Sequence, residues 1–383
     1  MKKALIISCF NWYEKRLQPV REVLIEERYS VTVLMSDFNH VRKKAVEYKI
    51  EECMYIHVPE YKSNISFSRI KSHVIFALTV RNYINKINPD LIYLLMPPNL
   101  SGLFCAEYKR KHKDIILVAD LIDLWPESMP IGFFSKTIAA KIWRGWRETC
   151  LAKADHVFTE CGLYQKKLSD ALNRHKMSTL HLYKVMPDEL RKQVENIIEQ
   201  RKGQKEDKTI KFAYLGSINN IIDVEGICSV ISIFKNNEYK TELHVVGKGE
   251  KTEHFLRQVE TCGCKTYYYG VIFEQAEIIN KLARCDCAFN MMKSTSEVGL
   301  TIKSIDYFSM GLPIINNIKG DTWHLVKRYG IGVNVQSTDW EELKGVEQIK
   351  HESVVKVFEH FFTRDIFIRK VRKALLGIRC NDS

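Results

Sequence analysis

The segment Ser296–Ile315 contains residues whose types and spacing suit the binding of a nucleotide diphosphate. Thr301 precedes a predicted helix and can cap it, which leaves backbone N–H groups and the positive end of the helix dipole at the helix start. Such an end suits a phosphate, and Lys303 adds a cation in the first turn. Asp306 lies one turn later on the same face, where its carboxylate can accept hydrogen bonds from vicinal hydroxyls such as those of a ribose. The alternative is an ordinary buried strand–helix–strand segment with a surface Lys–Asp pair, and the residue types alone leave both interpretations open.

The elements that would position this segment alternate between buried strands and helices from residue 210 onward. The strand candidates are Ile210–Leu215, Glu242–Val246, Thr266–Tyr269, Cys287–Asn290 and Pro313–Asn316. Glycine turns follow the first two strands, as YLGS (Tyr214–Ser217) and HVVGKGE (His244–Glu250). A G-x-G turn is weak evidence by itself because it is common in loops. The alternation predicts a parallel sheet with crossover helices, and ligands of such sheets lie beyond the carboxyl ends of the strands.

The first half of the chain shows the same alternation. Its strand candidates are Ala4–Ser8, Val31–Met35, Tyr55–Val58, Leu91–Leu95, Ile115–Ala119 and His156–Thr159, and its helix candidates are Gln18–Arg28, Phe67–Ile87 and Leu100–Lys111. The loop DLIDLWPESM (Asp120–Met129) follows the fifth strand and carries the carboxylates of Asp120, Asp123 and Glu127. These carboxylates could hold sugar hydroxyls. The alternative is that Asp120 or Asp123 only caps the following turn.

The segment Phe133–Ala154 mixes aromatic residues with lysine and arginine. A basic, aromatic-rich helix of this kind could lie in a membrane interface. A core helix with Ile138, Ile142 and Trp146 facing inward fits equally well. Of the net charge of +12, residues 1–200 carry about +8, which favours an anionic membrane, a nucleic acid or a phosphorylated acceptor as partner. Nucleic acid is the weakest of the three because the sequence contains no recognised nucleic-acid-binding motif.

Length and composition favour a two-domain cytoplasmic protein. The chain has 383 residues, 45% of them hydrophobic, and no apolar run reaches the ~20 residues of a membrane-spanning helix. The N-terminal MKKALIISCF predicts a buried strand, since its apolar run is too short for a signal peptide. The eleven cysteines include no C-x-x-C pair, so no metal site is expected from them. The polar stretch Pro187–Lys208 predicts the connection between the domains.

The run TIKSIDYFSMGLPII (Thr301–Ile315) resembles the nucleotide-binding segment of retaining glycosyltransferases of family 4. In the branch that builds capsule and O-antigen polysaccharides, this segment is roughly P-S-K-x-x-[ED]-Y-x-x-x-G-x-P. The corresponding positions here are Thr301, Ile302, Lys303, Asp306, Tyr307, Gly311 and Pro313. Asp306 takes the place of the second of two glutamates in the wider family, and Glu297 stands one residue before the place of the first. The loop DLIDLWPE resembles the D-x-x-D-L-W-P-E segment of the same branch.

This resemblance implies a set of site residues. It implies that Asp123 and Lys303 are catalytic and that the donor is contacted by Gly216, Ser217, Gly247, Glu297, Thr301, Ile302, Asp306 and Tyr307. After YLGS the family usually has an arginine or lysine pair for the diphosphate, whereas this chain has Asn219, Asn220 and Asp223. The phosphate charge must then be met by Lys303, by helix N–H groups or by Lys248.

The resemblance also implies an α/β fold of the GT-B type, with two Rossmann-like domains facing each other across a cleft. The expected ranges are 1–190 for an acceptor-binding domain, 191–209 for a linker, 210–350 for a nucleotide-sugar-binding domain, and 351–383 for helices that return to the first domain. The implied activity is sugar transfer, with retention, from a nucleotide sugar (UDP-sugar favoured) to a lipid-linked polysaccharide precursor, without cofactor or metal. We expect the protein at the inner, anionic face of the cell membrane. The alternatives are a nucleotide-sugar epimerase of the same architecture and a non-catalytic membrane-associated scaffold.

Overall fold

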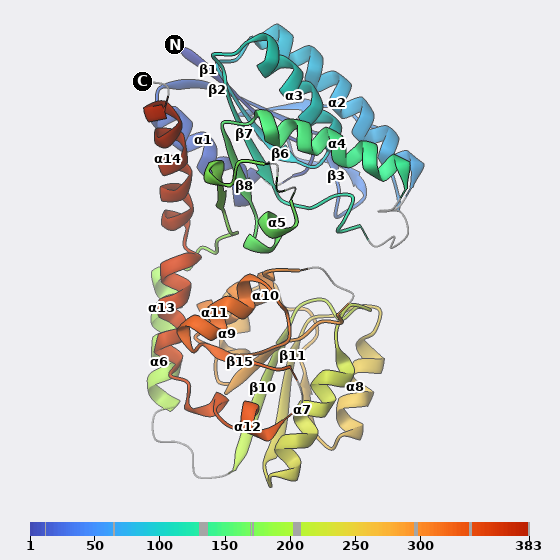
Figure 1. Cartoon of the computed structure of the whole chain (residues 1–383). Coiled ribbons are helices and arrows are strands. Elements are labelled where there is room, and N and C mark those ends of the chain that lie inside the picture. The colour runs from blue at the N-terminus through green and yellow to red at the C-terminus, as the bar shows by residue number, and fades with distance from the viewer. Residues whose placement is uncertain are drawn as a thin grey trace. The chain divides into compact units, whose positions relative to one another are not determined.

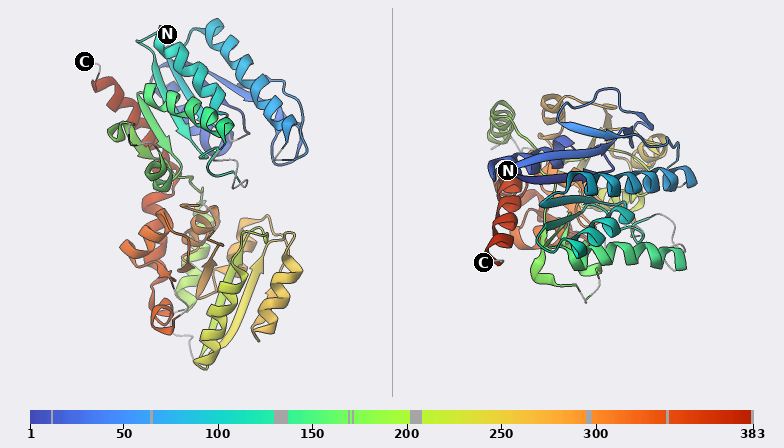
Figure 2. Two further views of the ribbon diagram at one scale, coloured as in Figure 1. Left: turned by 45° about the vertical axis from the view of Figure 1, so that its right-hand side comes forward. Right: turned by 90° about the horizontal axis from the view of Figure 1, so that it is seen from above.

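The computed structural model describes residues 1–11, 13–63, 66–129, 137–168, 170, 172–201, 208–294, 298–336 and 339–381. The chain forms two compact units, of which the first comprises Met1–Leu182 with Phe367–Ser383 and the second Tyr183–Ile366. Each unit is built on one parallel sheet with helices on both faces (Figures 1 and 2). The predicted α/β class with two Rossmann-like domains is therefore confirmed.

The sheet of the first unit has seven strands in the order β5-β2-β1-β6-β7-β8-β9. Its strands are β1 (Lys2–Ser8), β2 (Tyr29–Ser36), β5 (Cys53–Ile56), β6 (Leu91–Met96), β7 (Ile116–Leu121), β8 (His156–Thr159) and β9 (Met177–Thr179). A short antiparallel pair, β3 (Phe38–Asn39) with β4 (Lys44–Ala45), lies outside this sheet. All six residues of β6 are buried, because helices cover both faces of a central parallel strand and the strand must be apolar throughout.

The helices of the first unit are α1 (Gln18–Glu26), α2 (Phe67–Ile87), α3 (Asn99–Lys111), α4 (Ile138–Lys153), α5 (Gly162–Lys167) and most of α14 (Arg364–Asn381), with a π-helical turn at Tyr13–Leu17 and a 3₁₀ turn at Arg174–Lys176. Side chains of α2, α3 and α4 share one core cluster with the sheet. Helix α14, from the other end of the chain, lies beside α1 (Figure 1). Arg372 pairs with Glu26 of α1, and the guanidinium of Arg16, in the π-helical turn before α1, lies 5.7 Å from the centre of the Phe367 ring.

The sheet of the second unit has six strands in the order β12-β11-β10-β13-β14-β15. Its strands are β10 (Thr209–Leu215), β11 (Lys240–Val246), β12 (Lys265–Tyr268), β13 (Cys287–Asn290), β14 (Ile314–Asn316) and β15 (Gly332–Asn334). Its helices are α6 (Asp188–Arg201), α7 (Val224–Asn236), α8 (Thr252–Thr261), α9 (Gln275–Leu282), α10 (Ile302–Ser309), α11 (Asp321–Tyr329), α12 (Trp340–Leu343) and α13 (His351–Phe361), with a 3₁₀ turn at Val346–Gln348. Strand β10 is central, and its carboxyl end leads directly into the YLGS turn.

The unit boundaries differ from the ranges expected from the sequence. Most of the expected linker 191–209 is helix α6, which belongs to the second unit and is fixed to it by an Arg201–Asp286 ion pair of 2.6 Å. Its apolar residues Val194, Ile197 and Ile198 are buried, because their i, i+3, i+4 spacing places them on one face. Of the expected C-terminal range 351–383, α13 groups with the second unit and Phe367–Ser383 with the first.

Within the described part of the chain, no helix combines the length and the apolar character needed to cross a lipid bilayer. The described residues also include no cluster of three or more His, Cys, Asp and Glu side chains suited to a metal ion.

Candidate functional site

Two glycine turns lie side by side at the carboxyl ends of β10 and β11. Leu215 is paired with Val246 in the sheet register, so Gly216 and Gly247 follow at the same level. Both have positive φ, +116° and +139°, a region that favours glycine. A Cβ on Gly247 would lie 2.0 Å from the Gly216 carbonyl oxygen, and one on Gly216 would lie 2.9 Å from Cε of Lys303. The two glycines therefore allow the turns to pack together and allow Lys303 to cross over them.

Helix α10 begins next to these turns, after β13. The Thr301 hydroxyl accepts the backbone N–H of Ser304 at 3.0 Å and donates to Oδ1 of Asn290, the last residue of β13, at 2.9 Å. Thr301 is 6% exposed, so its side chain caps the helix and fixes it to the strand. The N–H groups of Ile302 and Lys303 lie in the first turn and have no acceptor within the helix. The predicted cap is confirmed, and it leaves donors at the helix start for an anion.

Lys303 extends across the glycine turn to Tyr214 of β10. Its Nζ donates to the Tyr214 hydroxyl at 2.7 Å and lies 4.4 Å from the centre of the Tyr214 ring. The Tyr214 hydroxyl in turn donates to the Ser217 carbonyl oxygen at 2.9 Å. Burial lowers the pKa of Lys303 to about 8, because the charged amine has lost most of its water. A bound anion would supply the missing counter-charge.

Asp306 forms an ion pair with a residue far away in the sequence. Its Oδ1 is 2.6 Å from Nζ of Lys184, which precedes α6 in the second unit. Both side chains are largely buried, with 23% of Asp306 and 16% of Lys184 exposed. The surface Lys303–Asp306 pair considered as an alternative is not formed, because Lys303 bonds to Tyr214 and Asp306 to Lys184.

These groups line one pocket of about 240 Å³, here called the α10 pocket. Its lining residues are Leu215, Gly216, Ser217, Asn219, Ile221, Met292, Ile302, Lys303 and Asp306. The pocket thus brings together five of the predicted site residues: Gly216, Ser217, Ile302, Lys303 and Asp306. Typical small-molecule sites measure ~300–1,000 Å³, so the pocket is sized for part of a nucleotide sugar.

The remaining predicted donor contacts of this unit lie behind the pocket or outside the described residues. Tyr307 is fully buried; its hydroxyl accepts the N–H of Leu215 at 2.8 Å and donates to the Phe289 carbonyl at 3.3 Å. Tyr307 therefore holds the end of β10 against α10 and has no surface in the pocket. Thr301 caps α10 and Gly247 packs against Gly216, so both support the pocket without lining it. Glu297 lies outside the described residues.

The side chains after the YLGS turn have local structural partners. Asp223 caps α7 by accepting the N–H of Gly226 at 2.9 Å, and Asn219 accepts the N–H of Ile221 at 3.2 Å. Asn220 bonds to Glu250. Among the described residues that line the α10 pocket, Lys303 carries the positive charge, whereas the charge of Lys184 is compensated by Asp306.

In the first unit, Asp123 lies at the carboxyl end of β7 among polar and aromatic groups. Its carboxylate accepts hydrogen bonds from the Ser128 hydroxyl, the Trp125 indole and the Leu124 backbone N–H. Burial raises the pKa of Asp123 above its ordinary value despite these bonds. A half-buried carboxyl group of this kind can exchange a proton or hold a hydroxyl more readily than a solvated one.

Asp123, Trp125, Arg69 and His73 form what we call the Asp123 cluster. The Arg69 guanidinium lies 4.4 Å from the centre of the Trp125 ring, and the His73 ring stacks on the same indole with centroids 5.6 Å apart. Burial, followed by the charge of Arg69, lowers the pKa of His73 to about 3, so this imidazole is neutral at physiological pH. The cluster ties the β7 loop to α2 at the edge of the sheet where ligands of this fold class bind.

Asp120 and Glu127 have structural partners. Asp120 is fully buried and accepts bonds from Arg16 at 2.6 and 2.7 Å and from the Tyr93 hydroxyl at 2.6 Å. Glu127 accepts bonds from Arg144 at 2.6 Å and Arg147 at 2.7 Å. Asp120 has no exposed surface for a sugar hydroxyl, and both oxygens of Glu127 already accept hydrogen bonds from arginines, so Asp123 remains the candidate among the three carboxylates of this loop.

Helix α4 differs from the core-helix pattern considered from the sequence, and one of its basic residues is internal. Arg147 is 1% exposed and pairs with Glu127 and Glu148, so part of the basic face is internal. Conversely, Ile138 and Ile142 are 76% and 52% exposed, which contradicts the core-helix pattern. Ile138, Lys141 and Ile142 are exposed and lie within about one helical turn; these three are here called the exposed face of α4. Phe133, Phe134 and Lys136 lie outside the described residues.

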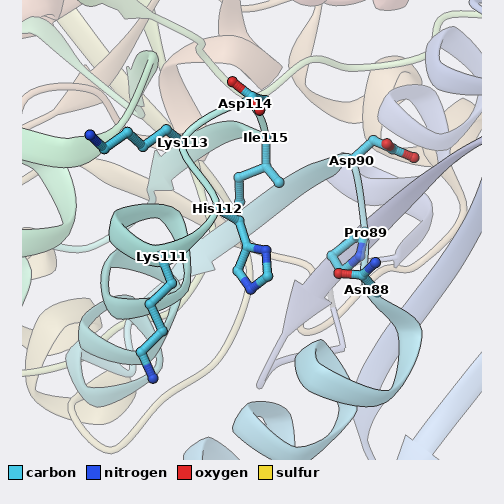
Figure 3. Close-up of a pocket in the computed structure, with 8 residues that line it drawn as sticks. All are labelled: Asn88, Pro89, Asp90, Lys111, His112, Lys113, Asp114 and Ile115. Atoms are coloured by element: carbon cyan, nitrogen blue, oxygen red, sulfur yellow. The ribbon is translucent and has the colours of Figure 1, made fainter.

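A second hollow, of about 490 Å³, lies at the amino ends of β6 and β7 and is shown in Figure 3. It is lined by Asn88, Pro89, Asp90, Lys111, His112, Lys113, Asp114 and Ile115. The side chains of Lys111, Lys113 and Asp114 point away from one another, and charges of both signs are present (Figure 3). Because ligands of open α/β sheets bind at the carboxyl ends of the strands, this hollow is a poor candidate for the donor.

Several residues of the two sites were not identified from the sequence. Lys184 and Tyr214 are separated from their partners by 122 and 89 residues, and no local spacing indicates such pairs. Tyr214 belongs to the YLGS segment, two residues before Gly216. A hydroxyl-bearing side chain this close to a glycine turn could have indicated a residue of the site. Arg69 and His73 lie four residues apart on one face of α2, a pattern that an ordinary amphipathic helix also shows.

Comparison with known proteins identifies the fold. No protein-family model matches the sequence, and no curated protein matches it. Among solved structures, HepE from Anabaena, in complex with UDP, is 11% identical and superposes with a TM-score of 0.64 over 98% of this chain and 100% of its own. The lipopolysaccharide outer core galactosyltransferase WaaB is 12% identical, with a TM-score of 0.67 over 98% and 99%. The UDP-GlcNAc 2-epimerase from Methanocaldococcus jannaschii is 13% identical, with a TM-score of 0.56 over 98% and 100%. At these identities the likeness establishes the architecture: the chain has the GT-B fold, with two Rossmann-like units each built on a parallel sheet.

Proposed function

We propose that this protein is a glycosyltransferase that takes its sugar from a nucleotide-diphosphate sugar bound in the α10 pocket. The observation that carries the proposal is the pocket itself, where a capped helix start, a desolvated lysine and a carboxylate meet beside two glycine turns. The helix start and Lys303 suit a diphosphate, and Asp306 suits the ribose diol. UDP is the favoured nucleotide, since HepE was solved with UDP in the same fold.

The chemistry of the proposed reaction follows from the charges that develop in it. As the glycosidic bond to the diphosphate breaks, negative charge grows on the leaving phosphate and positive charge on the sugar ring. Lys303 and the N–H groups of the first turn of α10 are preorganised donors for the leaving group. We propose retention of configuration, with the leaving phosphate accepting the proton of the attacking hydroxyl, so that neither an enzymic base nor a metal ion is required. We propose that Asp123, in the first unit, holds a hydroxyl of the acceptor.

We expect UDP to bind in preference to GDP, ADP and dTDP in a thermal-shift panel. At 100 times its Kd, a ligand stabilises the folded protein by about 2.7 kcal/mol, enough for a shift of several degrees.

Asp306→Ala should weaken UDP binding about 10- to 100-fold in calorimetry, because a charged hydrogen-bond acceptor for the ribose is lost. Asp306→Glu, which keeps the carboxylate, is the matched control. Unchanged affinity in Asp306→Ala would refute the ribose assignment.

The acceptor is proposed to be a lipid-linked saccharide presented at an anionic membrane, with the exposed face of α4 as the docking surface. Ile138 and Ile142 are apolar and exposed, and Lys141 between them is exposed as well. Burial of two isoleucines in the interface supplies a salt-resistant contribution, and a lysine near an anionic surface adds ~1 kcal/mol that salt screens.

We therefore expect the protein to co-sediment with phosphatidylglycerol-containing vesicles and less with neutral vesicles. The triple change Ile138→Ser, Lys141→Glu and Ile142→Ser should lower this binding several-fold while UDP affinity stays the same. Arg144 and Arg147 are left unchanged because their charges are internally paired. Lys113→Glu, at the hollow of Figure 3, changes the net charge by the same amount and is the control for loss of charge alone. Equal vesicle binding by the wild type and the α4 variant would exclude this surface.

The nucleotide-sugar epimerases among the structural neighbours give the second candidate function its support. An epimerase converts the donor alone, whereas a transferase needs an acceptor. Incubating UDP-N-acetylglucosamine with the protein and analysing the product by NMR separates the two. A scaffold without catalytic activity would fail to bind any nucleotide of the panel.

A further inference from the structure

The ion pair between Lys184 and Asp306 places a residue of the inter-unit connection next to the proposed nucleotide site. Lys184 lies between the last residue of the first unit's continuous range, Leu182, and helix α6. Its Nζ is 2.6 Å from Asp306 Oδ1, and only 16% of its side chain is exposed. Holding a lysine side chain in one conformation costs conformational entropy, which the attraction to Asp306 must offset. Because the pair is largely shielded from water, this attraction is stronger than in an exposed surface ion pair.

The backbone of Lys184 is fixed to the same block of structure that carries Asp306. The Lys184 N–H donates to the carbonyl oxygen of Phe362, at the end of α13, at 2.8 Å. Phe362 is fully buried and stacks on Phe308 of α10, with ring centroids 6.0 Å apart. Phe308 is two residues from Asp306 on the same helix. The backbone of Lys184 and the helix that carries Asp306 are therefore both held by the same packing of α10 against the end of α13.

The pairing leaves the second oxygen of Asp306 available. Within the described residues, no group donates a hydrogen bond to Asp306 Oδ2, and Asp306 lines the α10 pocket. A carboxylate has lone pairs on both oxygens, so it can keep Lys184 on Oδ1 while it accepts ribose hydroxyls. A carboxylate held in one rotamer binds a diol with less loss of entropy than a mobile one.

We infer that Lys184 is a positioning residue that holds Asp306 for the ribose diol and so sets the preference of the pocket for ribonucleotides over 2′-deoxyribonucleotides. This inference rests on the proposed function. Lys184 acts through Asp306 and keeps the ion pair when the nucleotide binds. The lysine is then a determinant of sugar recognition that lies outside the family-like segment of α10.

The test compares UDP with 2′-deoxy-UDP by calorimetry on the full chain. In the wild type we expect tighter binding of UDP. Lys184→Met should weaken UDP about tenfold and 2′-deoxy-UDP much less, so that the preference for UDP shrinks. Lys184→Arg should restore most of the preference, because the guanidinium can also pair with a carboxylate. Lys208→Met, which removes the exposed partner of Glu238 in the same unit, is the control and should change neither affinity.

A double-mutant cycle identifies the route of the effect. In the Asp306→Asn background, Lys184→Met should cause no further loss of UDP affinity, because its partner is already neutral. Circular dichroism and thermal unfolding establish that each variant is folded. Equal loss of UDP and 2′-deoxy-UDP, or UDP binding by Lys184→Met as tight as or tighter than wild type, would overturn the inference while leaving the proposed function intact. If the wild type binds no nucleotide diphosphate, the proposed function and this inference both fail.

Discussion

Replacing Lys303 by methionine is expected to weaken UDP binding by about 10- to 100-fold while the affinity for uridine changes little. Lys303 is the cation that lines the α10 pocket, and the diphosphate is the part of the ligand that carries the charge. The loss should therefore be specific to charged ligands. Calorimetry with UDP and uridine measures both affinities. Equal weakening of the two ligands would mean that the lysine supports the pocket only as a partner of Tyr214.

The pH dependence of UDP affinity is a second test of the role of Lys303. Burial lowers the pKa of Lys303 to about 8 in the ligand-free protein, and a bound diphosphate favours the charged amine and raises this pKa. Binding above pH 8 must therefore take up a proton, so UDP affinity should fall as the pH rises through 8, by at most about tenfold per pH unit. Lys303→Arg, which stays charged, should remove this dependence. Lys281→Met is the matched control, because Lys281 also lies over a tyrosine ring, Tyr269, at 4.9 Å but outside the pocket.

Replacing Asp120 by asparagine is expected to lower the stability of the first unit by about 3–5 kcal/mol. Arg16 and Asp120 are both fully buried, and the change leaves the guanidinium without its bidentate partner. Urea unfolding, with hydrogen exchange to assign each transition to a unit, measures the effect. The double change Arg16→Met with Asp120→Leu should recover part of the loss, because no charge then remains buried.

The control for the Asp120 experiment is Glu26→Gln, which removes the exposed ion pair with Arg372. With 59% and 43% of the two side chains exposed, this pair should contribute no more than about 1 kcal/mol. If Asp120→Asn were as mild as Glu26→Gln, Asp120 would have to be reconsidered as a ligand-binding carboxylate.

The parts of the fold that depend on local sequence could be predicted closely. Helix α2 spans the predicted Phe67–Ile87, because Ser66 caps its start and Asn88, in the left-handed region, ends it before Pro89. Helix α10 begins after its predicted cap, Thr301, for the same kind of reason. Central strands such as β6 are short continuous apolar runs, and the Asn88-Pro89-Asp90 turn signal before β6 favours a strand over a buried helix.

The contacts that depend on the folded chain could not be predicted. The sequence places Lys303 and Asp306 one turn apart and so suggested a pair, but each has a stronger partner brought in by the fold. Helix α6 was expected to be a linker because its charges outnumber the three apolar residues on its buried face. The sequence left the location of the α4 arginines open, and Arg147 is buried, since two glutamates brought to it by the fold compensate its charge.

The discontinuous first unit has a consequence for the order in which the protein is completed during synthesis. The second unit, Tyr183–Ile366, is one uninterrupted range and has all its residues before the last helix is made. The first unit begins earlier but includes Phe367–Ser383. Its surface around Arg16 and Glu26 lacks Phe367 and Arg372 until the ribosome has translated the whole of the second unit. The unit that starts first on the ribosome is thus the one that is finished last.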